Sequence, residues 1–171
     1  LSLSPSTRSP VAQATGLLYF PNSTSHVLSQ NRSSPPCNRV DDMKAAVFYQ
    51  VGGPEVLRYE EFPEPALRPG GLLIDVKAIA IQGGDTLHRQ GGVLATTPHI
   101  VGYQAAGIIR QVGEGVTSFV AGQAVVATMG FGSHAEVISV PASSAWAIPE
   151  ALDIELAAGV PIEFGTADDC L

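Results

Sequence analysis

Apolar and polar residues alternate most clearly in residues 72–81, LLIDVKAIAI. Alternate positions fall on opposite faces of a strand, so one face carries Asp75 and Lys77 between apolar neighbours, and the other is apolar throughout. Similar short runs predict further strands at residues 44–50, 56–62, 105–112, 124–128 and 134–140. Glycine-rich turns separate these runs. The pattern predicts a mainly β fold, built as a partly open barrel with short helices.

Helical signals are few and short. Residues 83–90 predict one or two helical turns, and Asp153 is placed to cap a short helix that runs through Val160. Thr166 and Asp169 have the spacing of a capping box, which predicts the start of another helix. Because a single turn gains little against the cost of nucleation, we expect helical sequence to follow Leu171.

The first 42 residues differ in composition from the rest. They are rich in serine and proline, contain no acidic residue before Asp41, and have no sustained period. This pattern predicts a disordered extension over residues 1–42. The composition is also compatible with an organelle transit peptide, with an untranslated leader or with an added sequence. Met43 is then the expected native start, and the cytoplasm is the expected compartment unless residues 1–42 act as a targeting segment.

Charge and cysteine content exclude several classes of protein. The formal net charge is −7, with about +1 in residues 1–42 and about −8 in the remainder. An acidic body gives no electrostatic basis for nucleic-acid binding. No run approaches the roughly 18 apolar residues of a membrane span. The two cysteines, Cys37 and Cys170, give neither a disulfide framework nor a zinc site, which favours a reducing compartment.

The candidate site lies in residues 78–107, where polar side chains are grouped between two apolar runs. Binding sites are typically built in this way, from a few polar groups held by apolar walls. The polar side chains of interest in this stretch are Gln82, Asp85, Thr86, His88, His99, Tyr103 and Gln104.

Several segments, in order, carry a resemblance to a known family. They are MKAAVFYQVGGPEVLRYEEFPEP, IDVKAIAIQGGDTLHRQG, PHIVGYQAAGIIRQVGEGV, GQAVVAT, GSHAEV and FGTADDCL. Residues 43–171 resemble the N-terminal GroES-like domain of a medium-chain dehydrogenase/reductase. They are most similar to the zinc-independent quinone oxidoreductase, or zeta-crystallin-like, branch.

The resemblance implies an enzyme of two domains. Residues 43–160 would form the GroES-like substrate domain, and residues 161–171 would begin the crossover helix toward a Rossmann domain that binds NADPH. That second domain is absent from the sequence, in which no G-x-G-x-x-G motif occurs. The family is commonly dimeric, which implies a homodimer for the full-length protein.

The resemblance also argues against a metal. Zinc-dependent relatives carry a cysteine where this chain has Gln82, and a His-Glu pair where it has Tyr103 and Gln104. Zinc needs about four Cys, His or carboxylate donors, and Asp85 with His88 would not complete the set. We therefore expect no metal.

Without a metal, a ketone or quinone oxygen must be polarised by hydrogen bonds. The resemblance implies that Gln82 lies near the nicotinamide and substrate and that Tyr103 lines the substrate pocket. It also implies that Asp85 and Thr166 contact the cofactor. Each has a structural alternative: a polar strand end for Gln82, core packing for Tyr103, a helix cap for Asp85 and the capping box for Thr166.

One position departs from the family pattern. Leu87 replaces a tyrosine that usually faces the cofactor, and His88 could supply a proton donor in its place or be a surface histidine.

Two functions remain open from the sequence. In the first, the chain is the substrate-domain part of a zinc-free, NADPH-dependent reductase of quinones or activated carbonyls, inactive by itself. In the second, it is a GroES-like binding or scaffold module without chemistry.

Overall fold

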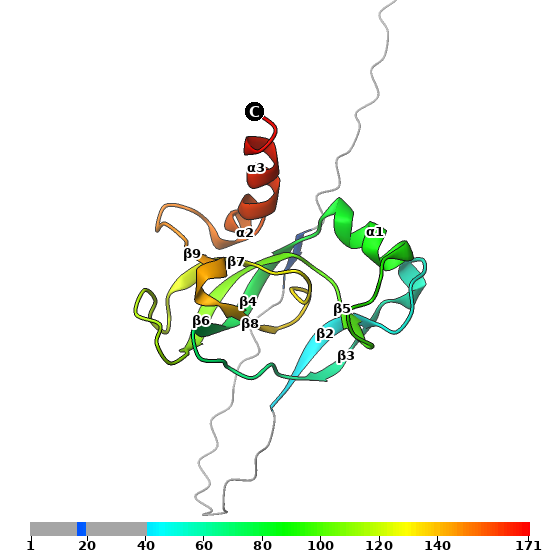
Figure 1. Ribbon diagram of the computed structural model, residues 1–171, viewed down its shortest axis with the longest axis horizontal. Coiled ribbons are helices and arrows are strands. Elements are labelled where there is room, and N and C mark those ends of the chain that lie inside the picture. The colour runs from blue at the N-terminus through cyan, green and yellow to red at the C-terminus, as the bar shows by residue number, and fades with distance from the viewer. Residues whose placement is uncertain (1–16, 20–40) are drawn as a thin grey trace, which may run out of the picture.

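The protein folds around two antiparallel β-sheets, seen in the computed structural model of Figure 1. The structure describes residues 17–19 and 41–171. The larger sheet has the strand order β1-β4-β6-β7-β9, and β8 also pairs with β4; the smaller has the order β3-β2-β5. The strands are β1 (Leu17–Tyr19), β2 (Asp42–Phe48), β3 (Arg58–Pro63), β4 (Gly71–Ala80), β5 (His99–Ile100), β6 (Gln104–Val112), β7 (Ala124–Thr128), β8 (Val137–Pro141) and β9 (Ala145–Ala147). The predicted mainly β fold is confirmed.

The segment before β8 joins the two sheets. Ala45 of β2 forms an isolated bridge with Ala135, and Val76 of β4 donates its N–H to the Glu136 carbonyl at 2.9 Å. Residues 134–136 therefore lie between β2 and β4 and tie the smaller sheet to the larger one. This link gives the partly open barrel that the strand spacing predicted.

The main core fills the larger sheet. Its fully buried side chains come mostly from the alternating positions of β4 and β6, including Leu72, Ile74, Ile79 and Ile109. A smaller cluster around Met43, Val47 and Val137 lies between the sheets, with Leu73 on the opposite face of β4 from Leu72 and Ile74. On that opposite face Asp75 and Lys77 are only partly buried, which explains why the sequence of β4 is apolar on one face and mixed on the other.

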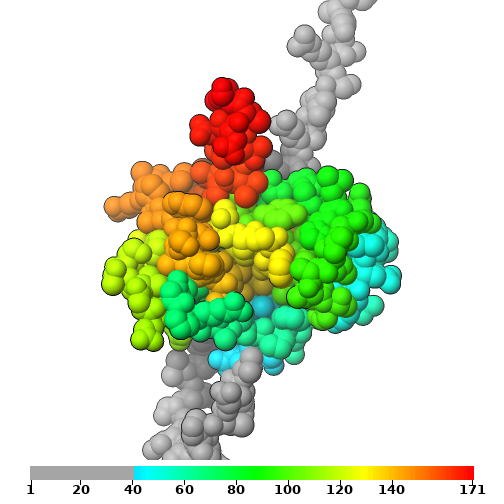
Figure 2. Space-filling model, in the orientation of Figure 1, coloured from blue at the N-terminus to red at the C-terminus, as the bar shows by residue number. Residues whose placement is uncertain are grey.

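Helices cover only the rim of the barrel, as Figure 1 shows. The α-helices are α1 (Gly83–Gly91), α2 (Ile154–Ala157) and α3 (Val160–Asp168), with short 3₁₀ turns at η1 (Pro54–Val56) and η2 (Ala142–Ser144). Arg89 fixes the end of α1, because its guanidinium donates to the Gly52 carbonyl at 2.5 Å. In the space-filling view α3 projects from the rounded body (Figure 2).

Two predicted features at the chain's ends need correction. Residues 1–42 were predicted to be disordered throughout, but Leu17–Tyr19 pair with Ala78–Ala80 of β4, and β2 already includes Asp42. The rest of that prediction, for residues 1–16 and 20–40, lies outside the described residues.

The predicted capping box at the end of the chain is wrong. α3 begins with Gly159 as N-cap and Val160 as its first residue, so Thr166 lies inside the helix and Asp169 is its C-cap. Pro161 in the first turn explains the earlier start, because proline fits the first helical positions and needs no hydrogen bond there. The Asp153 cap is confirmed, since its carboxylate accepts the N–H groups of Glu155 and Leu156.

Candidate functional site

The candidate site lies where β4 ends beside the start of β6. The two strands are antiparallel and Ile79 pairs with Ala105, so the residues just beyond the pairing, Gln82 and Gln104, come together although 22 positions separate them. Gln82 is half-buried as the N-cap of α1, and Gln104 is fully buried as the first residue of β6.

α3 supplies the third member of this site, which the sequence alone did not indicate. The Glu163 carboxylate accepts one hydrogen bond from the Gln82 amide nitrogen and one, at 2.7 Å, from the Gln104 amide nitrogen. The Gln104 amide oxygen accepts the Ile162 N–H at 3.0 Å. Gln82, Gln104 and Glu163, hereafter the glutamine clamp, join the base of α3 to the two strand ends.

Asp85 lies directly behind the clamp and caps α1. Its Oδ2 accepts the Gln82 N–H at 2.7 Å, and the residue is only 3% exposed. Burial raises the pKa of the Asp85 carboxyl, opposed by the hydrogen bond from Gln82. The structure thus supports the capping alternative, with Asp85 in the first turn of the helix rather than before it. The carboxylate points inward, away from any cofactor outside the barrel.

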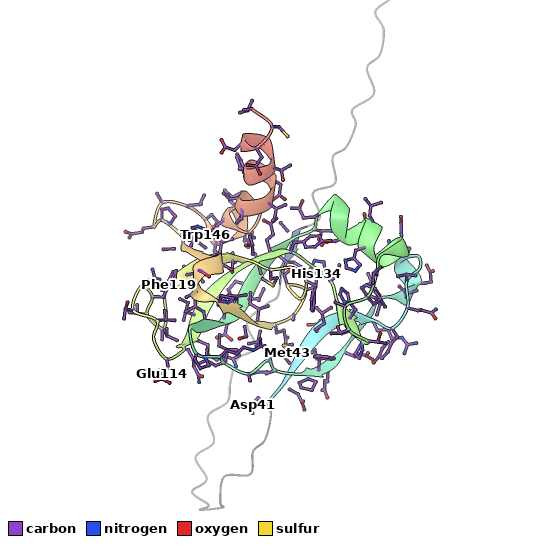
Figure 3. All side chains as sticks on the ribbon, in the orientation of Figure 1. Asp41, Met43, Glu114, Phe119, His134 and Trp146 are labelled. Atoms are coloured by element: carbon purple, nitrogen blue, oxygen red, sulfur yellow. The ribbon has the colours of Figure 1, made fainter. Side chains whose placement is uncertain are left out.

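Asp85 also belongs to a second group of polar side chains, the buried polar cluster of Asp85, Ser133 and His134. The His134 Nε2 lies 3.7 Å from Asp85 Oδ2. Figure 3 shows His134 in the middle of the barrel. Burial lowers the pKa of His134 to about 4, so its ring is neutral at pH 7.

The buried polar cluster is poorly satisfied. Within residues 41–171, Asp85 Oδ1, Ser133 Oγ and His134 Nε2 have no hydrogen-bond partner. Gly102 provides the space for them: a Cβ there would lie 2.0 Å from Ser133 Oγ and 2.5 Å from His134 Cδ2, and its φ is +112°. No pattern in the sequence pointed to this cluster, because it forms only when Asp85 of α1 packs against the distant Ser133 and His134.

His99 is another buried polar residue that the sequence did not assign. It is fully buried, and neither ring nitrogen has a partner in the described part of the chain. Its ring packs against those of Phe48, His88 and Phe131, with centroids 4.8–5.2 Å apart. Burial, and to a smaller extent His88, lowers the pKa of His99. It therefore packs as an aromatic side chain.

Tyr103 lines an open groove of about 600 Å³ beside α1. The groove is bounded by α1, the turn after it and the Tyr103 ring, whose hydroxyl has no hydrogen-bond partner among the residues described. Leu87 is 69% exposed along the same groove. His88 is tied to the turn, since its Nε2 lies 2.9 Å from the Val93 carbonyl and must donate to it. Of the residues that line this groove, Tyr103 and Gln90 therefore offer polar donors to a ligand.

The remaining predicted site residue, Thr166, is exposed on α3. A second, more apolar groove of about 680 Å³ runs between α3 and β9, where Trp146 is half-exposed at the barrel rim. Within the described residues, no group of three or more His, Cys, Asp or Glu side chains is placed to hold a metal ion.

Comparison with known proteins identifies the fold. Residues 68–150 match the family described as "Alcohol dehydrogenase GroES-like domain". The crystal structure of the human synaptic vesicle membrane protein VAT-1 homolog-like protein matches with a TM-score of 0.74 and 31% identity, covering 77% of this chain and 43% of that one. The barrel is a GroES-like domain of the medium-chain dehydrogenase/reductase family.

Other members of the family are named as reductases. The NADPH-dependent alkenal/one oxidoreductase of Arabidopsis thaliana, a chloroplastic protein by name, is 34% identical over 143 residues, covering 76% of this chain and 37% of that protein. Escherichia coli quinone oxidoreductase, solved in complex with NADPH, matches with a TM-score of 0.65 and 34% identity over 67% of this chain and 36% of that one. The chain thus spans about a third of the length of these oxidoreductases.

Among the helices of residues 41–171, none is long and apolar enough to cross a membrane.

Proposed function

We propose that this GroES-like domain forms the substrate side of a zinc-independent, NADPH-dependent reductase of quinones or activated carbonyls. One observation carries the proposal: the three positions assigned by resemblance to zinc ligands hold groups suited to hydrogen bonding. Gln82 and Gln104 direct their amide nitrogens at a carboxylate, and Tyr103 directs a free phenol at the groove. Amide nitrogens and a neutral phenol are poor ligands for zinc.

The chemistry divides between the cofactor and the barrel. When bound, NADPH supplies the hydride that a carbonyl or quinone carbon accepts. The substrate oxygen then gains negative charge and needs a proton. Tyr103 can donate a hydrogen bond to this oxygen and then its proton, which solvent replaces. The Gln82 amide nitrogen carries two N–H groups, and one of them donates to Glu163. The other can donate to the same substrate oxygen.

The described residues fit a bound dinucleotide at one edge only. Gln82 is half-buried with one amide N–H that Glu163 does not need, and Thr166 is exposed on α3, so both are open to a cofactor beside α3. Asp85 is not open to a cofactor, because its carboxylate is buried between α1 and His134. The partners we propose are a small quinone or carbonyl substrate and a second copy of the full-length chain, with neither nucleic acid nor a membrane. The proposed compartment is the cytoplasm, or an organelle if residues 1–42 are a targeting segment.

A chimeric enzyme tests the function. Residues 43–171 would replace the corresponding part of Escherichia coli quinone oxidoreductase, and NADPH oxidation would be followed at 340 nm with a quinone and with an α,β-unsaturated ketone. We expect quinone-dependent oxidation that falls about 100-fold in Tyr103→Phe, the range attributed to a positioned proton donor. Tyr49→Phe changes an exposed tyrosine directly after β2 that does not line the groove, and should leave the rate unchanged.

The non-catalytic alternative makes the opposite prediction. A chimera that binds NADPH with native affinity but oxidises it no faster with any quinone or enone would favour a binding module. The 171-residue chain alone should bind NADPH more weakly than about 1 mM, the weak end of the affinity scale. Tighter binding would contradict the assignment of the cofactor site to a second domain.

A further inference from the structure

The glutamine clamp fixes which way two amides point. A carboxylate can only accept hydrogen bonds, so an amide beside it must present nitrogen rather than oxygen. Both Gln82 and Gln104 do so toward Glu163. The Gln104 amide is fixed a second time, because its oxygen accepts the Ile162 N–H, and this independent contact requires the same orientation.

We propose that Glu163 is a positioning residue for Gln82. It holds the half-buried Gln82 amide in one orientation, with one N–H left over for a substrate or cofactor. Without an acceptor at this position, the amide would sample both orientations and several rotamers, because terminal amide torsions are broad and roughly two-fold. The substrate part of this inference rests on the proposed function; the orientation of the amide does not.

The clamp also couples α3 to the barrel. Its two carboxylate contacts link residues 81 and 59 positions apart in the chain. Glu163 lies in the first turn of α3, the helix that stands out from the barrel in Figure 1. A displacement of α3 would carry the carboxylate away from Gln82, so the donors that Gln82 offers depend on the position of that helix.

Side-chain amide NMR on the 171-residue chain tests the positioning directly. In the unchanged protein at pH 7, the side-chain NH₂ groups of Gln82 and Gln104 should both show nuclear Overhauser contacts to Glu163, and Gln82 should show the side-chain couplings of a single rotamer. Glu163→Gln keeps the size of the side chain but removes the charge, so the Gln82 couplings should become rotamer-averaged and its NH₂ signals should move. The matched control is Glu155→Gln on α2, whose side chain makes no contact with either glutamine, and it should leave the Gln82 and Gln104 signals unchanged.

A second variant guards against a folding defect. Glu163→Asp keeps the charge on a side chain one methylene shorter, and should retain the couplings of a single Gln82 rotamer. If the Gln82 couplings are the same in the unchanged protein and in Glu163→Gln, Glu163 does not position it. If Glu163→Gln moves the NH₂ signals of only one of the two glutamines, the two amides do not share one carboxylate.

The active chimera tests the functional consequence by a double-mutant cycle. Glu163→Gln should lower kcat/KM about tenfold when Gln82 is present, in line with the cost of misplacing a group near the chemistry. In a Gln82→Ala background the same change should cost less than about twofold, because two residues that act as a unit are not additive. Equal losses in both backgrounds would show that Glu163 acts through something other than Gln82. An inactive chimera, together with Gln82 couplings that average in Glu163→Gln as expected, would reject the proposed function and leave the positioning role standing.

Discussion

Two neighbouring groups of polar side chains in this barrel, joined where Gln82 donates to Asp85, are built in opposite ways. The glutamine clamp is satisfied: each of its three side chains is hydrogen-bonded to a partner on another element, and Glu163 is exposed to solvent. The buried polar cluster of Asp85, Ser133 and His134 is desolvated and leaves three polar atoms without a partner among the described residues. Desolvation of unpaired polar groups is costly, whereas a paired amide–carboxylate set costs little.

The difference predicts which region controls stability and which controls function. The buried cluster has no access to a ligand, so changes there should alter the free energy of unfolding and its pH dependence. The clamp contacts α3 and Tyr103 lines the groove, so changes at these residues should alter binding and turnover. The four predictions below separate the two regions, in order of decreasing effect.

The largest effect should come from the close packing behind Gly102. Gly102→Ala places a Cβ 2.0 Å from Ser133 Oγ in a backbone conformation, φ +112°, that side chains rarely adopt. Gly132→Ala meets the same strain, at φ +108°, but finds nothing within 4 Å. We expect losses of about 4 kcal/mol for Gly102 and about 2 kcal/mol for Gly132 by urea denaturation. Equal losses would mean that the cluster is not tightly packed around Gly102.

The pH dependence of unfolding should report His134. Its pKa is about 4 in the folded protein against 6.5 for the unfolded chain, so between these values the unfolded state binds more protons. Stability contributed by the neutral ring is therefore present above pH 6.5 and lost as the pH falls toward 4, by about 3 kcal/mol at 1.4 kcal/mol per pH unit. His99, whose pKa is also lowered, adds a loss of the same sign.

His134→Gln should remove most of the His134 contribution. Denaturation midpoints measured at pH 7, 5.5 and 4 would then fall less steeply in the variant than in the unchanged protein. An unchanged slope would mean that the ring is solvated in the native state.

Within the clamp, Gln104→Ala should cost about 2 kcal/mol, because it removes two hydrogen bonds and leaves the Ile162 N–H without its acceptor. Gln111→Ala, at an exposed position of the same strand, should change the free energy of unfolding by less than about 0.5 kcal/mol. A loss no larger than that of the control would show that the clamp does not hold α3 to the barrel.

The smallest effect should separate the two roles of Asp85. Asp85→Ala loses the acceptor of the Gln82 N–H and should cost about 1 kcal/mol at pH 7. Asp85→Asn retains an acceptor oxygen and removes a charge that burial disfavours, so it should be neutral or stabilising at pH 7. Because the folded pKa is raised, the benefit of Asn over Asp should vanish as the pH falls and the carboxyl becomes neutral. If Asp85→Asn lowers the free energy of unfolding as much as Asp85→Ala does, the charge itself is required.

Sequence reasoning succeeded where the pattern is local. The strand at residues 124–128 was predicted at its observed bounds, and β4 and β6 were each predicted within one residue, because alternation along a buried strand is strong there. Sequence reasoning missed the shortest strands. β5 has two residues and β9 three, which is too few to show a period. β8 begins at Val137, three residues later than predicted, because residues 134–136 bond to β2 and β4 instead of extending one strand.

The site divides in the same way. Gln82, Tyr103 and Asp85 could be selected because they sit in one polar stretch between apolar runs and match positions of the family pattern. Glu163, His134 and Ser133 could not, since each lies far along the chain from the residues it meets. The predicted capping box at Thr166 was wrong because the three-residue spacing of Thr166 and Asp169 is a weak signal. Gly159 and Pro161 form the stronger helix start, and α3 begins there.

By itself, the sequence determined the β architecture, the likeness to a GroES-like domain and the polar stretch at the end of β4, because these depend on periodicity and on neighbours a few residues apart. Only the tertiary structure decided which amides meet the Glu163 carboxylate and which polar groups are sealed without partners. Those outcomes depend on which segments pack together, and burial and hydrogen bonding between distant residues leave no periodic trace in the chain.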